Sequence, residues 1–148
     1  MFDLDLCFTA IRTTGVLTQS VAAAATPATN VLDMGADNIR LEGKKQLFLK
    51  VLCTEALAGT GTTMTIDLET DTAVGMATAC KQVMRIGPIP KARCIAGVML
   101  VNQQLPAQTY QRYWRVRFTG DNTFETTGSL IAWLDDSAEP SVPQLDTI

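Results

Sequence analysis

The sequence predicts an all-β protein: a single-domain antiparallel β-sandwich, with an eight-stranded jelly roll as the favoured form and a Greek-key sandwich of another topology as the alternative. Apolar and polar residues alternate with period two along most of the chain after residue 45, and glycine and proline turns separate the alternating stretches. A chain of 148 residues is long enough for one domain with a sizeable core. Only 18% of the residues are charged, so small and uncharged polar residues cover much of the surface.

The N-terminal part is the least regular. It opens with the acidic stretch Met-Phe-Asp-Leu-Asp-Leu, so we expect no secretory signal there. The four alanines at 22–25 favour a helix, but Pro27 follows them and the run is far shorter than the ~12–15 residues of a marginal isolated helix. We therefore expect residues 21–25 to be extended or loosely coiled, and residues 30–34 to form a short strand that ends at Gly35.

The clearest strands bring one apolar face each to the core. The segments QLFLKVLCT, TTMTIDLET and RYWRVRFTG each place an apolar residue at every second position. The expected core residues are Leu49, Val51, Met64, Ile66, Leu68, Trp114, Val116 and Phe118. Strands are expected near residues 6–12, 30–34, 46–54, 63–70, 82–86, 94–101, 112–119 and 128–134. The prolines of IGPIPK separate the fifth strand from the sixth, because they exclude a helix or a central strand.

The last residues differ from the domain that precedes them. Residues 1–135 form the expected sandwich domain, whereas residues 136–148 lack a core-forming pattern and are expected to be an extended tail. Its prolines favour extended conformations, and its last apolar residues could anchor it in a partner's groove; the alternative is a passive, solvated terminus. The candidate contacts in the tail are Asp136, Pro140, Pro143, Leu145 and Ile148.

Composition argues against several classes of function. The net charge of −3 gives no basic surface for nucleic acid, and no apolar run approaches the ~20 residues of a membrane span. The chain has no histidine, and its four cysteines are scattered without a Cys-x-x-Cys pair, so we expect reduced thiols and no metal site. Cys94 lies near Lys91 and Arg93 but has no base to activate it. We expect no catalytic residue, no cofactor and no small-molecule substrate.

Two short motifs have ordinary structural explanations. GTGTT at 59–63 resembles a phosphate-binding loop, but no lysine follows it, so a turn is the better interpretation. Arg112, Arg115 and Arg117 alternate with aromatic residues, as on a surface that stacks single-stranded nucleic acid. The simpler interpretation is a strand whose outer face carries arginines that pair with Asp67 or Glu69 across a sheet. Arg115 and Arg117 are also candidate contacts for a protein partner.

Several segments together resemble the small cement, or decoration, proteins of tailed-bacteriophage capsids. These segments are QSVAAAATPATNVLDMGA, LFLKVLCTEAL, TMTIDLET, LPAQTYQRYWRVRFTG and GSLIAWLDD, which span roughly residues 18–136. The residues that match the family's motifs are Asn30, Asp33, Gly35, Arg112, Tyr113, Arg115 and Asp135. The central part, DTAVGMATACKQVMRIGPIPKARCIAG, fits the family less well.

The resemblance implies a jelly-roll protein on the outer surface of a virion capsid, made in the host cytoplasm. It would bind the major capsid protein, clamp neighbouring copies together, and associate with itself, with a dimer favoured over a trimer. Two other classes stay open at this point. A small neck or tail component of a virion would share these features, and a carbohydrate-binding β-sandwich would need aromatic platforms at its loop tips.

Overall fold

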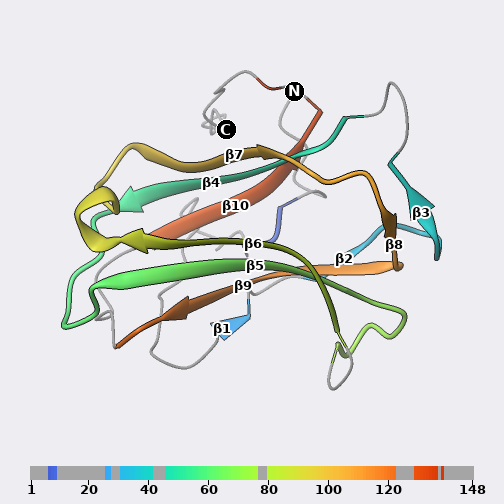
Figure 1. The fold of residues 1–148 in the computed structure, drawn as a ribbon, viewed down its shortest axis with the longest axis horizontal. Coiled ribbons are helices and arrows are strands. Elements are labelled where there is room, and N and C mark those ends of the chain that lie inside the picture. The colour runs from blue at the N-terminus through green and yellow to red at the C-terminus, as the bar shows by residue number, and fades with distance from the viewer. Residues whose placement is uncertain are drawn as a thin grey trace, which may run out of the picture.

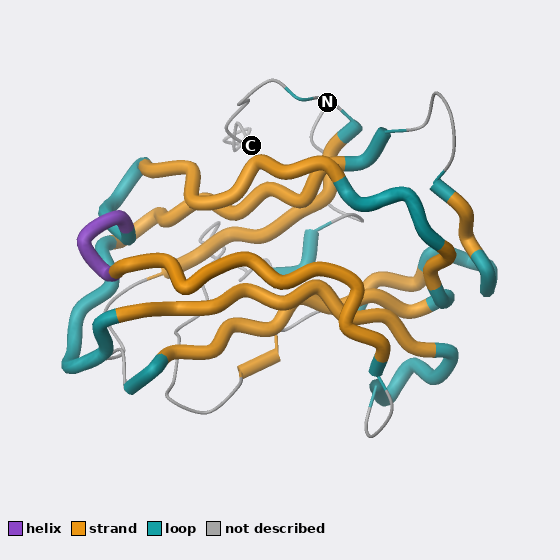
Figure 2. The backbone as a smooth tube through the Cα atoms, in the orientation of Figure 1, coloured by secondary structure: helices purple, strands orange, loops and turns teal. Residues whose placement is uncertain are grey.

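The alternation of apolar and polar residues produces two antiparallel sheets that face each other across one core (Figure 1). The computed structural model describes residues 7–9, 26–27, 31–41, 46–76, 80–122, 129–136 and 138. Among these described residues, one short 3-10 helix occurs, η2 (Lys91–Arg93). Figure 2 shows that strands make up most of the remaining backbone.

The larger sheet has the order β1-β9-β5-β6, and β2 also pairs with β9. Its strands are β1 (Thr26–Pro27), β2 (Leu32–Asp33), β5 (Thr63–Asp71), β6 (Lys81–Pro90) and β9 (Tyr113–Gly120). The two short strands share one edge of β9, because β1 pairs with Arg117 and Phe118 while β2 pairs with Tyr113 and Trp114. All of these pairings are antiparallel.

The second sheet has the order β10-β4-β7, formed by β4 (Phe48–Glu55), β7 (Val98–Gln104) and β10 (Ser129–Asp135). Residues 7–9 lie along the free edge of β10: Cys7 forms an antiparallel bridge with Trp133, and Phe8 donates its backbone N–H to Ala132 O at 2.9 Å. A separate two-stranded ribbon, β3 (Ile39–Arg40) with β8 (Thr109–Tyr110), lies at one end of the sandwich (Figure 1).

The strand order is that of a jelly roll. With residues 7–9 counted as the first strand, the eight strands in chain order are residues 7–9, β2, β4, β5, β6, β7, β9 and β10. In these numbers one sheet reads 1-8-3-6 and the other reads 2-7-4-5, so the chain passes repeatedly between the sheets. The all-β sandwich predicted from the sequence is confirmed, and each of its eight predicted strands has a counterpart.

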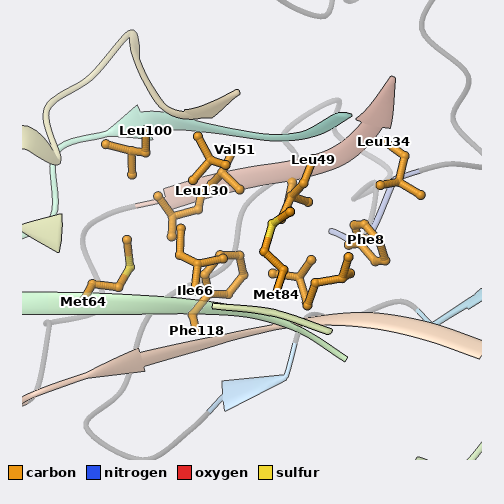
Figure 3. Close-up of a cluster of buried hydrophobic side chains, with 14 of the residues drawn as sticks. Phe8, Leu49, Val51, Met64, Ile66, Met84, Leu100, Phe118, Leu130 and Leu134 are labelled. Carbon is orange, nitrogen blue, oxygen red and sulfur yellow. The ribbon is translucent and has the colours of Figure 1, made fainter. Parts of the chain in front are cut away.

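The core lies between the two sheets, as Figure 3 shows for Leu49 and Val51 on one side and Met64, Ile66 and Phe118 on the other. Every residue expected in the core is fully buried: Leu49, Val51, Met64, Ile66, Leu68, Trp114, Val116 and Phe118. The ring of Trp114 stacks on Tyr110 with 4.6 Å between centroids. Its Nε1 donates a hydrogen bond to Gln111 O at 2.6 Å, so the buried indole keeps a polar partner.

Two strand boundaries differ from the prediction. The fifth strand was expected to end at residue 86, but β6 continues through the prolines to Pro90. This is possible because β6 is an edge strand, which pairs with a neighbouring strand only on the side of β5. The sixth strand was expected from residue 94, but β7 begins at Val98, since η2 and the turn after it occupy residues 91–97. The alanine run at 22–25 lies outside the described residues.

The sheet β10-β4-β7 is apolar on its outer face as well. Cys7, Leu52, Ile131 and Trp133 form a second buried cluster there, separate from the main core. Lys50 shares this face and is fully buried, with Nζ 2.8 Å from Asp135 Oδ2. The ion pair offsets the cost of burying the ammonium group.

Candidate functional site

A line of alternating charges crosses the outer face of the sheet β1-β9-β5-β6. Its centre is Glu69 of β5, which is buried and accepts from two arginines of β9. Arg115 Nε lies 2.8 Å from Glu69 Oε2, and Arg117 Nη2 lies 3.1 Å from the same oxygen. Arg115 also donates from Nη2 to Cys80 Sγ at 3.4 Å. One carboxylate therefore neutralises parts of two guanidinium groups within the chain.

Asp67, two residues before Glu69, completes this line. Arg85 of β6 forms a bidentate pair with it, at 2.7 Å from Nε to Oδ1 and 3.0 Å from Nη2 to Oδ2. The carboxylate of Asp67 raises the pKa of Arg85 above its ordinary value through these hydrogen bonds. Arg117 stands directly opposite Asp67 in the register, but it bonds diagonally to Glu69.

These contacts change the expected role of one arginine. Arg115 was a candidate partner contact on the outer face of its strand. The structure buries it between Glu69 and Cys80, and its guanidinium donates hydrogen bonds to both of these residues. Arg117 keeps 29% of its side chain exposed. Arg117 is therefore the more accessible of the two, although its Nε is buried and has no hydrogen-bond partner among the described residues. The interpretation that these arginines pair across the sheet with acidic residues of β5 agrees with both ion pairs to Glu69.

The motif residues Asp33 and Arg112 lie together at the start of β9. Arg112 binds Asp33 with two hydrogen bonds, at 2.7 Å from Nε to Oδ1 and 2.8 Å from Nη2 to Oδ2. Asp33 Oδ1 also accepts a hydrogen bond from the backbone N–H of Gly35 at 2.9 Å, which closes a turn. Gly35 has a φ of +80° in this turn, a conformation that favours glycine. Arg112 is the first cause of the lowered pKa of Asp33, which falls to about 2.

Backbone contacts strengthen this connection between β2 and β9. Met34 donates its N–H to Arg112 O at 3.0 Å, and the N–H of Arg112 bonds to Asp37 Oδ1 at 3.0 Å. The guanidinium of Arg112 lies 5.1 Å from the ring centroid of Tyr113, within the range of a cation–π contact. Asp33 and Arg112 thus hold the segment around β2 against the sandwich, and both are partly exposed.

The four cysteines are thiols that form no disulfide with one another, as expected. Cys7, Cys53 and Cys94 are buried, and Cys80 is half-buried. Burial raises the pKa of Cys53 to about 11 and raises the pKa of the other three as well. A raised pKa disfavours the thiolate, so these side chains have the properties of structural cysteines rather than nucleophiles.

The glycine-rich stretch at 59–63 forms a connection between β4 and β5. Gly59 O accepts a hydrogen bond from Lys91 Nζ, and Thr62 donates its N–H to Asp121 Oδ1 at 2.8 Å. Thr62 O accepts the N–H of Lys91 at 2.8 Å. The polar groups of this loop bond to the neighbouring loops, which agrees with the interpretation of a turn.

No group of three or more His, Cys, Asp or Glu residues that could hold a metal ion occurs among the described residues. Within that portion, no helix is long and apolar enough to span a membrane.

The beginning of the tail crosses the outer face of the smaller sheet. Asp135, the last residue of β10, pairs with Lys50 of β4, and Asn102 of β7 donates from Nδ2 to Ala138 O at 2.9 Å. Asp136 is exposed. The other tail candidates, Pro140, Pro143, Leu145 and Ile148, lie outside the described residues. The Lys50–Asp135 pair was not predicted from the sequence, because a lysine on the outer face of a strand normally lies in solvent.

The family assignment follows from residues 16–134, which match the family model described as Bbp16. The chain belongs to the Bbp16 family. This is a phage-related structural protein family, which agrees with the resemblance of the sequence to structural proteins of phages. No curated protein sequence matches the chain. The Bbp16 match covers the strands from β1 to β10, except Asp135, and both segments of the Asp33–Arg112 contact.

Proposed function

We propose that this Bbp16 protein is a capsid cement protein, which binds the outside of an icosahedral shell and holds neighbouring major capsid proteins together. The observation that carries the proposal is the family match over a jelly roll whose motif residues connect strands to one another. The proposal gives the protein no catalytic residue, no cofactor, no small-molecule substrate, and no role with nucleic acid or membranes. Its place is the outer surface of the virion, after synthesis in the host cytoplasm.

The proposed binding to the shell relies on many weak contacts, made by a surface whose charges are largely paired within the chain. The charges on the outer face of the larger sheet are largely paired within the chain, as at Glu69 and Asp67. A protein with few unpaired charges can lie against a shell with a small desolvation cost. When one copy touches two shell subunits, the second contact forms at a high effective concentration, and many such copies resist pressure from within.

The carbohydrate-binding alternative loses support from the same structure. Such a module needs aromatic rings displayed at its loop tips. The described aromatic side chains are buried or partly buried, and Trp114 and Trp133 are nearly or fully inaccessible. A neck or tail component differs from a cement protein in its number of copies in each particle, so the test includes a count.

The test mixes the purified protein with expanded shells that lack it, then measures co-sedimentation and counts bound copies against the major capsid protein by quantitative mass spectrometry. We expect saturable binding in constant proportion to the major capsid protein, together with greater resistance of the shell to heat. Unexpanded shells are the control. Binding at a few copies per particle would support a neck or tail component, and absence of binding would refute the proposal.

A truncation after Ala138 tests the tail within the same assay. It keeps the contacts of Asp135 and Ala138 while it removes Pro140, Pro143, Leu145 and Ile148. If the tail is an arm that holds a neighbour, the shortened protein keeps its melting temperature within a few degrees and binds shells measurably more weakly. Equal binding by both forms would identify a passive terminus.

A further inference from the structure

Two large apolar side chains are exposed in the described part of the chain. Val74 is 64% exposed and Ile95 is 52% exposed. A single exposed apolar residue is ordinary on a protein surface. These two are distinguished by their positions at opposite ends of the sandwich and by the hydrogen bonds that fix the loops carrying them.

The two residues lie beyond the two ends of one hairpin. β5 pairs with β6 in the antiparallel sense, and Val74 follows the end of β5, whereas Ile95 follows the end of β6 and η2. Figure 1 shows η2 and the connection after β5 at opposite ends of the long axis of the molecule. β5 contains 9 residues, which at about 3.4 Å per residue extend over roughly 30 Å. One shallow pocket on a partner is therefore too small to cover both residues.

Backbone hydrogen bonds fix the Ile95 loop (residues 91–97) to β4 and to the segment that follows β4. Gly97 donates its N–H to Cys53 O at 2.8 Å, and Cys94 O accepts a hydrogen bond from the N–H of Leu57 at 3.0 Å. The side chain of Cys94 is buried in the core, directly before the exposed Ile95. The backbone is thus held on both sides of Ile95, so little further ordering is needed when a partner binds.

The Val74 loop (residues 72–76) is fixed in a similar way. Asp71 Oδ1 accepts a hydrogen bond from the N–H of Ala73 at 3.1 Å, and Met76 donates its N–H to Ala73 O at 3.1 Å. The side chain of Met76 is buried. Val74 therefore lies in a closed turn that is anchored on both sides of it.

Small or uncharged residues accompany both exposed side chains. The Val74 loop contains no charged residue, and Ala92 and Ala96 are exposed in the Ile95 loop. Arg93, exposed in the same loop, forms no ion pair with a described carboxylate. An apolar side chain with small neighbours fits a pocket on a partner, and a cation in the same loop favours a pocket with an acidic rim.

We propose that one copy of this protein joins two neighbouring shell subunits through these two loops. The Val74 loop enters an apolar pocket on one subunit, and the Ile95 loop enters an apolar pocket with an acidic rim on the next. This inference rests on the proposed function and assigns its two contacts to particular residues. Two subunits fit better than one because the loops lie at opposite ends of the molecule. The rigid sandwich between the loops gives the second contact a high effective concentration once the first has formed.

The first test measures the binding of variants to the expanded shells used above. Val74→Ser and Ile95→Ser are each expected to weaken binding by about five- to tenfold, because roughly half or more of each side chain is still to be buried. Ile95→Val keeps an apolar contact and should bind nearly as well as the wild-type protein. Gln82→Ser, at an exposed position of β6, should leave binding unchanged. Thermal unfolding verifies that each variant is folded, as expected for changes at exposed positions.

The second test determines how many subunits one copy contacts. A photo-crosslinking amino acid replaces Val74, Ile95 or both, and shells carrying each protein are irradiated. The doubly substituted protein is expected to yield a covalent product of one copy with two major capsid proteins. Each singly substituted protein is expected to yield a product with one major capsid protein.

The outcomes separate this inference from the proposed function. Absence of binding by the wild-type protein would overturn the proposed function and this inference with it. Wild-type binding that neither Val74→Ser nor Ile95→Ser weakens would overturn the inference alone. A doubly substituted protein that becomes linked to only one major capsid protein would do the same.

Discussion

The replacement of Trp114 by alanine probes the centre of the sandwich. Trp114 is fully buried in the core, its ring stacks on Tyr110, and its Nε1 bonds to Gln111 O. Removal of a buried tryptophan typically costs about 3–5 kcal/mol, part of which is the cavity left behind. The stacking contributes about 0.5–1.5 kcal/mol beyond area, and the carbonyl of Gln111 loses a donor. We therefore expect a loss near the top of the range, about 5 kcal/mol, which is a large share of the roughly 5–15 kcal/mol of a typical domain.

Urea unfolding followed by far-ultraviolet circular dichroism measures this loss, and the remaining tryptophan, Trp133, gives an independent fluorescence signal. Trp114→Phe is the matched variant: it keeps an aromatic ring against Tyr110 but removes the indole N–H, so its loss should be clearly smaller. Gln82→Ala, at an exposed position, should change stability by less than about 0.5 kcal/mol. A loss below about 1 kcal/mol for Trp114→Ala would mean that the faces of β9 are assigned the wrong way round.

Two further predictions concern ionisable groups. The pKa of Asp33 is lowered to about 2 by Arg112, so the stability that this pair contributes is fully present above the ordinary value of 3.8 and is lost as the pH falls through about 2. A carboxyl-carbon NMR titration should show that midpoint, and Arg112→Met should return it towards 3.8; an unchanged midpoint would contradict the assignment. Thiol labelling of the native protein should modify Cys80 first and spare the three buried cysteines, whereas equal rates at all four would show that the core opens readily.

The sequence was sufficient to predict the strands that face the core on one side. In β4, β5 and β9 every second residue is apolar, because alternate side chains point to opposite faces of a sheet and one of these faces packs on the core. The ends of β6 could not be predicted in this way. Prolines at 88 and 90 exclude a central strand, but whether a strand lies at an edge depends on its neighbours in space, which are set by the whole topology.

The charged residues were predictable as a group, but their individual partners were not. Alternation placed Arg115 and Arg117 on the outer face with Asp67 and Glu69, and the structure shows ion pairs there. The register sets Arg117 opposite Asp67, yet Arg117 bonds to Glu69 and Arg85 takes Asp67. Which pair forms depends on side-chain length and on strands that are distant in sequence. The burial of Lys50 has no local signal in the sequence, and its partner Asp135 lies at the end of another strand.

The geometry of the Asp33–Arg112 contact shows that these two residues act within the chain. The carboxylate of Asp33 is occupied by both guanidinium nitrogens and by the N–H of Gly35, and the backbone of Arg112 is tied to Met34 and Asp37. Groups so fully engaged within the chain have little capacity left for a second protein, although they are partly exposed. The motif is therefore explained by the joining of β2 to β9. Under the proposed function, exposed residues outside this contact, such as Gln103 and Gln104 of β7, are where variants should change binding while the fold stays intact.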